Sequence, residues 1–377
     1  MNKRNLGSAR RVVVKIGTGV LTDSKGCFDA VHFARLVADL ADVARERQLV
    51  VVSSGAIALG VERLGLPKKP KDIPGKQACA AVGQGTLMHR YDSALGWAGY
   101  RAAQILLTHD DFSHRARYLN ARRAIERLLG HGAIPVVNEN DTVSVDEIKL
   151  GDNDALAGLV VGLISADLLV ILSDVDGLYT ADPRKDPKAR RLEVVPRVDA
   201  EIERLAGGST SGLGTGGMIT KVRAARRAAE SGAPTVVVPG KRVGALLQVL
   251  AGEPVGTLFE ANPERRLSSR QRWIAHALKP KGSLKVDDGA RRAILVSKRS
   301  LLATGVREVV GSFKNGDPVD IADLEGHVFA RGLSTYSAEE VRLIAGRKSS
   351  EIEAVLGYKY LDEIVHRDEL VELGGEQ

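Results

Sequence analysis

Aromatic residues and cysteine are scarce in this sequence. Aromatic side chains make up 4% of the 377 residues, so we expect a core of Val, Leu, Ile and Ala, which favours α/β layers over an aromatic-rich β-sandwich. Two cysteines, Cys27 and Cys79, are too few for a disulfide framework or a zinc cluster. This usage is typical of a reducing compartment, and we therefore expect a cytoplasmic protein.

Long apolar runs are missing as well. Residues 1–11 are basic and polar and lack the apolar stretch of a secretory signal. The apolar region from Leu156 to Ile171 is interrupted at Ser165 and Asp167, whereas a membrane-spanning helix needs about 20 consecutive apolar residues. The sequence thus predicts neither export nor a membrane partner.

The positive charge lies in one part of the chain. The net charge is +7, yet from residue 277 onward there are 15 basic and 17 acidic residues. The first 276 residues therefore carry the whole basic excess, and this length is enough for two or three domains. We expect any anionic ligand to bind in the first part.

A glycine-rich stretch in that part is the first candidate site. Residues 207–221 read GGSTSGLGTGGMITK, with a helical pattern from Met218 to Glu230 after them. Glycine lets successive N–H groups face one point, and the N-terminus of a helix attracts anions. Lys221 would lie on the first helical turn, so the stretch predicts a phosphate-binding loop. A flexible linker with a chance lysine is the alternative.

The preceding residues alternate between strand and helix patterns, which is typical of a parallel sheet. Arg11–Ile16 and Leu49–Val52 are short, mostly apolar strands that each end in a turn rich in glycine and small polar residues. Lys15 lies near the carboxyl end of the first strand, where ligands bind in open α/β sheets. Ser54 follows the second strand. A surface lysine and a helix-capping serine are the structural alternatives.

Two polar segments with carboxylates and amides follow. Asn138-Glu-Asn-Asp141 comes after the strand at 133–137, and Gly151-Asp-Asn-Asp154 precedes a helix at 155–164. One carboxylate is enough to cap a helix, whereas these segments supply four acids and three asparagines. The surplus indicates a site for a substrate ammonium group or a hydrated cation. Plain capping remains the alternative.

The C-terminal part has a different character. Short β-like runs at 283–286, 293–295, 306–310, 318–321 and 327–331 are separated by glycine-containing turns. We expect an α/β domain over residues 1–262, a linker over 263–277 and a small, mostly β domain over 278–370. The first is predicted to be a three-layer sandwich with a mainly parallel central sheet.

Phosphoryl transfer fits the first domain better than other phosphate chemistry. The P-loop pattern is absent. A G-x-G-x-x-G pattern occurs at Gly212, Gly214 and Gly217 and suggests a dehydrogenase, but no strand precedes it and the next strand lacks a ribose-binding acid. Lys15 and Lys221, from separate loops, can flank a transferring phosphoryl group.

Taken together, these motifs resemble the amino acid kinase family, in particular its glutamate-phosphorylating branch. The order and spacing agree over the first 260 or so residues, and the C-terminal part resembles the PUA domain. The matching segments are Val14–Thr18, Ser54–Ala56, Asn138–Asp141, Gly151–Asp154, Gly177–Pro183 and Ser211–Met218, with Gly316–Val319 and Gly332–Ser334 in the C-terminal part.

The resemblance implies ATP-dependent phosphorylation of the glutamate γ-carboxylate, the first step of proline synthesis. Lys15 and Lys221 would flank the transferring group. Ser173 and Asp174 would line the ATP site, and Ser173 is a departure because Thr is common there in the family. The other implied ATP-binding residues are Thr215, Gly216, Gly217, Met218, Ile219 and Thr220. The implied glutamate-binding residues are Ser54, Asp141 and Asn153, with Asp152 and Asp154 close by.

The resemblance also implies Mg²⁺ as a cofactor, proline as feedback inhibitor, a γ-glutamyl phosphate reductase as partner, and a homo-oligomer, dimer or tetramer. The ligands of the metal stay open. Another family member that acts on a different carboxylate or on a carbamate is one alternative. An RNA-binding protein is another, because PUA domains often bind RNA, although the balance of 15 basic to 17 acidic residues argues against it.

Overall fold

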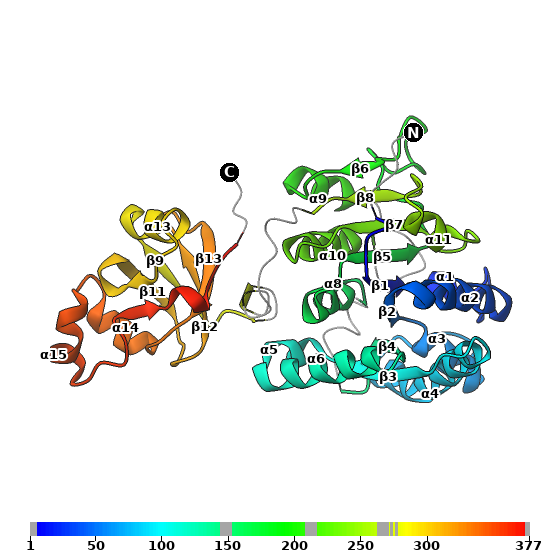
Figure 1. The fold of residues 1–377 in the computed structure, drawn as a ribbon, viewed down its shortest axis with the longest axis horizontal. Coiled ribbons are helices and arrows are strands. Elements are labelled where there is room, and N and C mark those ends of the chain that lie inside the picture. Colours follow the sequence, from blue (N-terminus) through cyan, green and yellow to red (C-terminus); the bar gives the residue numbers. More distant parts are fainter. Residues whose placement is uncertain are drawn as a thin grey trace. The chain divides into compact units, whose positions relative to one another are not determined.

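A sheet of eight strands forms the centre of the first unit of the protein (Figure 1). The computed structural model describes residues 6–143, 153–207, 217–261, 271, 274–275 and 278–373. It divides the chain into two compact units, one of residues 1–111 and 116–266 and one of residues 112–115 and 267–377. Each unit is described by itself.

The sheet of the first unit consists of six strands that the sequence predicts and two short ones that it does not. The strand order is β3-β4-β2-β1-β5-β7-β8-β6, and β8 runs antiparallel to β7 while the pairs from β3 to β7 are parallel. The strands are β1 (Arg11–Ile16), β2 (Gln48–Ser53), β3 (Ala102–Leu107), β4 (Ile134–Glu139), β5 (Leu168–Ser173), β6 (Val194–Val195), β7 (Thr235–Pro239) and β8 (Thr257–Phe259).

The sequence pattern predicts six of these strands, β1 to β5 and β7. It misses both β6 and β8, because runs of two and three residues are too short to show a period. The antiparallel β8 pairs with β7 from Thr235 to Val237. The sheet is therefore mainly parallel, as expected, with a reversed pair of strands at one edge.

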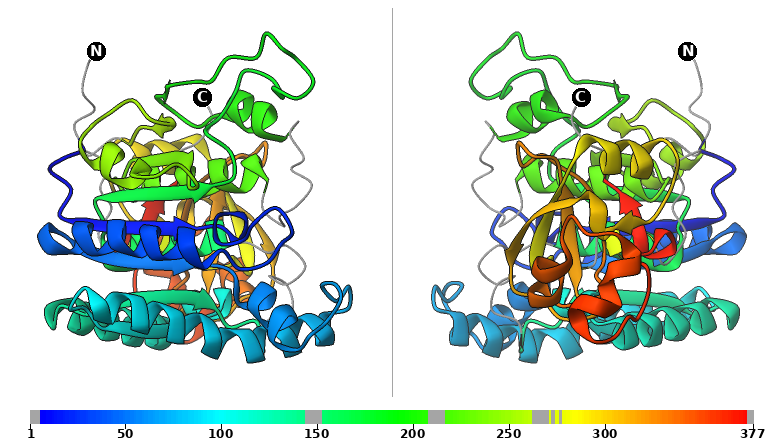
Figure 2. Two further views of the ribbon diagram at one scale, coloured as in Figure 1. Left: turned by 90° about the vertical axis from the view of Figure 1, so that its right-hand side faces the viewer. Right: turned by 90° about the vertical axis from the view of Figure 1, so that its left-hand side faces the viewer.

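Helices cover both faces of this sheet. Figures 1 and 2 show α2, α3, α4 and α11 on one face and α6, α8 and α10 on the other. The predicted three-layer sandwich with a mainly parallel central sheet is thus confirmed. The helices are α1 (Thr18–Leu21), α2 (Ala30–Glu46), α3 (Ala56–Arg63), α4 (Ile73–Trp97), α5 (His109–Ser113), α6 (Arg115–Gly130), α8 (Asn153–Ile164), α9 (Ala200–Gly207), α10 (Met218–Glu230) and α11 (Ala245–Leu250).

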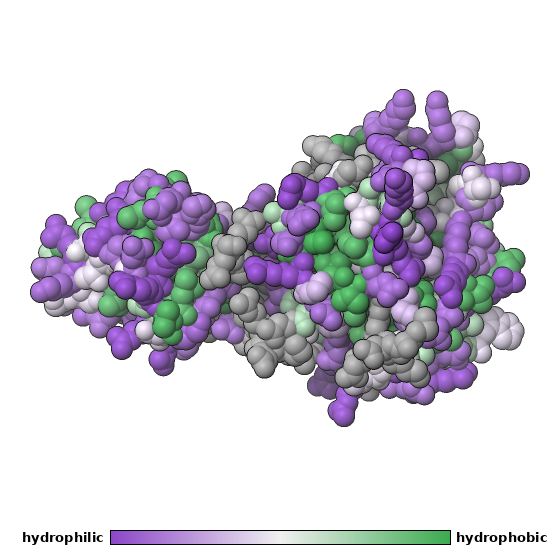
Figure 3. All heavy atoms as spheres, turned by 90° about the horizontal axis from the view of Figure 1, so that it is seen from above, coloured by the Kyte–Doolittle hydropathy of each residue, from purple (hydrophilic) through white to green (hydrophobic). Residues whose placement is uncertain are grey.

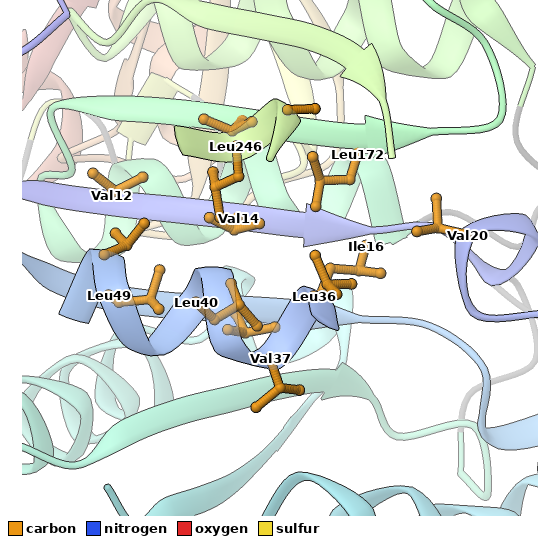
Figure 4. Packing of buried hydrophobic residues seen from close by; sticks show 14 of the residues in the cluster. Val12, Val14, Ile16, Val20, Leu36, Val37, Leu40, Leu49, Leu172 and Leu246 are labelled. Atoms are coloured by element: carbon orange, nitrogen blue, oxygen red, sulfur yellow. The ribbon is translucent and has the colours of Figure 1, made fainter. Parts of the chain in front are cut away.

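Strand β1 lies between β2 and β5, and its side chains alternate between the two faces. Val12, Val14 and Ile16 belong to the aliphatic core beneath α2, where they lie close to residues such as Leu40 (Figure 4). By the same alternation, Lys15 faces the opposite side, which α8 and α10 cover. The parallel order also brings the carboxyl ends of β1, β2, β4 and β5 to one edge, which we call the carboxyl edge.

Helices α3 and α4 cross very closely at two glycines. A Cβ atom added to Gly83 would lie 1.8 Å from the carbonyl oxygen of Ala56, and one added to Gly60 would lie 1.8 Å from that of Cys79. No side chain fits at these distances, because the neighbouring atoms belong to the backbone. The two glycines therefore fix how α4 lies against the start of α3.

Gly83→Ala is expected to lower the free energy of unfolding by about 1–3 kcal/mol, since the helices must move apart. Gly85→Ala, two residues further along α4, is the matched control, because its new Cβ meets nothing within 4 Å and alanine favours a helix by up to about 1 kcal/mol. Urea unfolding of both variants measures the difference. Equal stabilities would show that the close crossing is not needed.

The second unit is small and mostly β, as predicted. Its sheet has the order β11-β9-β12-β13-β15, and β10 pairs with β14. Its elements are β9 (Gly282–Val286), α13 (Asp288–Leu295), β10 (Leu301–Leu302), β11 (Val306–Gly311), β12 (Pro318–Ala322), β13 (Val328–Leu333), α14 (Ala338–Ile344), α15 (Ile352–Leu356), β14 (Glu363–Val365) and β15 (Leu370–Glu372), with short 3-10 helices at Ala303–Gly305, Ser349–Glu351 and Arg367–Glu369.

One predicted β run in this unit is wrong. Residues 293–295 end helix α13, which begins where the Asp287 carboxylate accepts a hydrogen bond from the Ala290 amide. A run of three apolar residues fits either a strand or a buried helical face, and the capping aspartate decides for the helix. The expected strands at 283–286, 306–310, 318–321 and 327–331 are present with small shifts of their ends.

Polar side chains cover much of the face of each unit that Figure 3 shows, and on the larger unit hydrophobic residues form one continuous group in the middle of that face. Among the described residues, none of the helices combines the length and the apolar character that crossing a bilayer requires.

Candidate active site

A buried carboxylate at the carboxyl edge binds both lysines that the sequence singled out. Asp154, at the start of α8, lies 2.7 Å from Lys15 Nζ through Oδ1 and 3.1 Å from Lys221 Nζ through Oδ2. All three side chains are buried, with 1%, 8% and 5% of their surface exposed in that order. Lysines that are 206 positions apart in the sequence thus meet at one group.

Asp154 stays ionised in this position. Burial alone would raise the pKa of its carboxyl, but the ammonium groups of Lys15 and Lys221 outweigh burial and hold that pKa well below the usual range. The Thr220 hydroxyl, 2.7 Å from Oδ2, donates a further hydrogen bond. Two cations therefore share one anion, and the cluster keeps one positive charge that is not neutralised within it.

The turn after β1 lies beside the residues that follow β5. The Gly17 amide donates to the Leu172 carbonyl oxygen at 3.2 Å, and a Cβ on Gly19 would lie 3.5 Å from Cβ of Asp174. The buried Ser173 hydroxyl donates to the Asp174 carboxylate at 3.0 Å. The structure thus brings two predicted ATP-site residues next to the strand that carries Lys15.

The start of α10 supplies the remaining described residues of the glycine stretch. Gly217 is the N-cap residue, Met218 is buried and Ile219 is half-buried. Thr220 and Lys221 on the first turn both reach Asp154. Thr215 and Gly216, like Gly212 and Gly214, lie outside the described residues.

Ser54 and Asn153 form a second polar group at the same edge. Asn153 Nδ2 donates to Ser54 Oγ at 2.9 Å and to the Ser53 carbonyl oxygen at 3.3 Å. The capping alternative for Ser54 is wrong, because Gly55 is the N-cap residue of α3 and no side chain caps that helix. Ser54 instead faces α8 from the end of β2.

Asp141 lies half-buried in the turn after β4, and its predicted neighbour Asp152 lies outside the described residues. A lysine from the α3–α4 connection lies close to Asp141. Burial and the Lys76 charge lower the pKa of Lys69, and the Asp141 charge acts against them. Gln77, on the first turns of α4, donates to the Thr142 carbonyl oxygen at 3.4 Å, so α4 borders this turn.

The N-terminus of α8 joins the two polar groups. Its first residue, Asn153, faces Ser54, and its second, Asp154, faces the lysines. The first amides of a helix and its positive dipole end favour anions. A carboxylate held near Asn153 and a phosphoryl group held near the lysines would therefore lie on either side of one helix terminus.

Comparison with known proteins agrees with this geometry. The model of the amino acid kinase family matches residues 10–239, and that of the PUA domain matches residues 282–356. The chain is 60% identical over 368 residues to the glutamate 5-kinase of Myxococcus xanthus, with 98% of this chain and 97% of the relative covered. Glutamate 5-kinases of Anaeromyxobacter dehalogenans and Pelobacter propionicus are 58% and 50% identical and cover 99% of this chain. The chain belongs to the amino acid kinase family.

For this amino acid kinase, the sequence-based resemblance, the fold and the C-terminal PUA domain are confirmed. What the sequence did not reveal is the layer of residues behind the site. Gln84 on α4 accepts a hydrogen bond from Asn138 Nδ2 at 2.9 Å, and Asn138 accepts one from Asn153 at 2.9 Å. The sequence shows Asn138 only as one residue of the motif 138–141.

A buried tyrosine supports the end of β2 in the same way. The Tyr91 hydroxyl lies 2.9 Å from Ser53 Oγ, and burial raises the Tyr91 pKa. Both Tyr91 and Gln84 come from α4, a segment whose sequence predicts a helix and nothing more. No signal in the sequence distinguished these positions from core residues, because their partners come from β2 and β4.

Proposed function

We propose that this kinase transfers the γ-phosphoryl group of ATP to the γ-carboxylate of L-glutamate and forms L-glutamyl 5-phosphate, the first step of proline biosynthesis. The relatives that cover nearly the whole chain carry the name glutamate 5-kinase. The observation that carries the proposal is the cluster of Lys15, Asp154 and Lys221. It is a buried, cationic group at the edge of the sheet where ligands bind in α/β proteins.

The lysines are proposed as the catalytic residues. A transferring phosphoryl group carries charge on its equatorial oxygens, so catalysis rests on positioning and on fixed positive charge. Lys15 and Lys221 supply this charge, and Asp154 orients both ammonium groups by binding one with each oxygen. Because each oxygen of Asp154 binds a lysine ammonium group, Asp154 is proposed to act on the reaction only by positioning the two lysines.

The acceptor needs no strong base. A carboxylate is already ionised at neutral pH, so one of its oxygens attacks the γ-phosphorus directly while the bond from that phosphorus to the ADP oxygen breaks. The electron pair of that bond leaves with ADP, and no proton has to move. The main barrier is the approach of two anions, which the positive charge of the cluster lowers.

Glutamate is proposed to bind at the wall formed by Ser54, Asn153 and Asp141, with Asp152 nearby. The Ser54 hydroxyl accepts from Asn153, which leaves its own hydrogen to donate to a substrate oxygen. ATP is proposed to lie beside Ser173 and Asp174 and at the start of α10, with Thr215 to Thr220 and Lys221 as its further contacts.

The residues also suit Mg²⁺ carried by ATP. Both oxygens of Asp154 are taken by lysines, so this carboxylate is a poor ligand. Asp174 is exposed, accepts from Ser173 and has no ion pair within the described part of the chain. Mg²⁺ is commonly held by one or two carboxylates together with substrate phosphates. Bound there, it would neutralise phosphate charge.

The test is hydroxamate formation from ATP and hydroxylamine with different acceptors. We expect product with L-glutamate and at least about tenfold less, in kcat/KM, with aspartate or N-acetylglutamate, because one misplaced or blocked group costs about 1.4 kcal/mol or more. Omission of Mg²⁺ should abolish the reaction. A preference for N-acetylglutamate or a carbamate would assign the chain to another branch of the family.

The remaining expectations belong to this proposal. An acyl phosphate is labile, so a γ-glutamyl phosphate reductase that takes it directly is the proposed partner, and proline is the proposed feedback inhibitor. A cytoplasmic homo-oligomer, with a catalytic domain over residues 1–262 and a PUA-like domain over 278–370, completes the proposal. Addition of proline to the hydroxamate assay and light scattering of the purified chain test inhibition and assembly separately.

A further inference from the structure

A row of side-chain amides runs from α4 to the start of α8. Gln84 Nε2 donates to Gln104 Oε1 at 3.4 Å, and Gln84 Oε1 accepts from Asn138 Nδ2 at 2.9 Å. Asn138 Oδ1 in turn accepts from Asn153 Nδ2 at 2.9 Å. The row ends at Ser54, whose Oγ accepts from the same Nδ2 at 2.9 Å.

The order of donors and acceptors in this row is fixed. An amide side chain has one donating and one accepting end, so each member sets the orientation of the next. The Ser53 carbonyl oxygen, 3.3 Å from Asn153 Nδ2, can only accept, which confirms the direction at this end. Asn138 is 2% exposed, and water therefore cannot easily replace its partner Gln84.

The consequence appears at Asn153. Its Nδ2 faces Ser53, Ser54 and Asn138, and its Oδ1 is buried without a hydrogen-bond partner in the described part of the chain. A buried acceptor without a donor is costly and is best satisfied by a ligand N–H group. An α-ammonium group supplies such donors, and an N-acylated amine supplies fewer and adds bulk.

We propose that Gln84 is a positioning residue that, through Asn138, orients the Asn153 amide so that its oxygen accepts from the substrate ammonium group. This inference rests on the proposed glutamate-binding role of Asn153. Gln84 contacts no reacting atom. Gln84 Oε1 accepts from Asn138 Nδ2 and so sets the orientation of the Asn138 amide. In that orientation Asn138 Oδ1 faces Asn153 and accepts from its Nδ2. Specificity for a free amino acid thus begins on α4, one residue from the close crossing at Gly83.

The experiment compares Gln84→Met with Gln84→Glu. Methionine keeps the length of the side chain and removes the acceptor, whereas glutamate keeps an acceptor for Asn138 Nδ2. We expect Gln84→Met to raise the KM for glutamate about tenfold with kcat within about twofold, which is the effect of losing about 1.4 kcal/mol of binding. Gln84→Glu should restore the KM to within about threefold of the parent.

Glutarate, which has both carboxylates of glutamate but no ammonium group, separates positioning from general damage. Its Ki as a competitor of glutamate should stay within about twofold in Gln84→Met, because it makes no bond to Asn153 Oδ1. Gln48→Met is the matched control. Gln48 Oε1 also accepts a side-chain hydrogen bond, from Arg11 Nε at 2.8 Å, but lies at the opposite end of β2, so both constants should be unchanged.

An unchanged KM in Gln84→Met, or equal weakening of glutamate and glutarate, would overturn the inference. Failure of Gln84→Glu to restore the KM would also overturn it, because the accepting oxygen would then not be the feature that matters. These results differ from failure of the proposed function, in which the parent enzyme itself would form no hydroxamate from glutamate.

Discussion

Lys221→Ala is expected to lower kcat by about 10²–10³-fold, the usual effect of removing one fixed charge that stabilises a transition state, while the KM for glutamate changes by less than about threefold. Lys221 Nζ is buried 3.1 Å from Asp154, on the first turn of the helix that follows the glycine stretch. Its charge can act on the phosphoryl group, whereas glutamate is proposed to bind at Ser54 and Asn153. Initial rates of hydroxamate formation with varied glutamate and saturating ATP measure both constants.

Arg223→Ala is the control for this variant. Arg223 lies two residues further along α10, is also cationic and is exposed, so its loss should leave kcat within about twofold, as for a screened surface charge. Lys221→Arg should not restore the rate, because a planar guanidinium does not match the position of the ammonium nitrogen beside Asp154. Turnover that survives in Lys221→Ala would remove this lysine from the mechanism.

The sequence predicted the lysines but not how they are held. Lys15 at a strand end and Lys221 at a helix start both carry a local signal, because parallel strands end at one edge and helix termini bind anions. The local sequence signal at Asp154 is ambiguous. A carboxylate at a helix N-terminus has the same local pattern whether it caps the helix, binds substrate or pairs with lysines that come from distant parts of the chain.

The role of Gln84 cannot be predicted from the local sequence pattern. Its role depends on β4 lying beside β2 and on α4 crossing α3 at Gly83, neither of which is encoded near residue 84. The strand predicted at residues 293–295 is wrong for a local reason, because an apolar run of three residues is too short to distinguish a strand from a helix. Sequence patterns thus predict elements and the residues at their ends, and packing decides which of those residues meet.

Asp154→Asn is expected to lower the free energy of unfolding at pH 7 by about 3–5 kcal/mol, because it leaves two buried ammonium groups without their counter-charge. Asp199→Asn is the matched control. Asp199 is exposed and accepts from the Ile202 amide at the start of α9, and asparagine caps a helix about as well as aspartate. If Asp154 were only a cap, the two variants would behave alike. Urea unfolding followed by circular dichroism compares them.

The dependence on pH distinguishes a lost ion pair from a lost hydrogen bond. The pKa of Asp154 is lower in the folded protein than in the unfolded chain, where it is about 3.9. The unfolded state therefore takes up a proton first as the pH falls. The stabilisation by this carboxylate is complete above that unfolded value and is lost progressively as the pH drops below it toward the folded one. Stability of the parent should consequently fall more steeply below about pH 4 than that of Asp154→Asn, which has no carboxyl to protonate at this position. Parallel curves for the two proteins would mean that the Asp154 charge does not stabilise the fold, and that the lysines are held by packing alone.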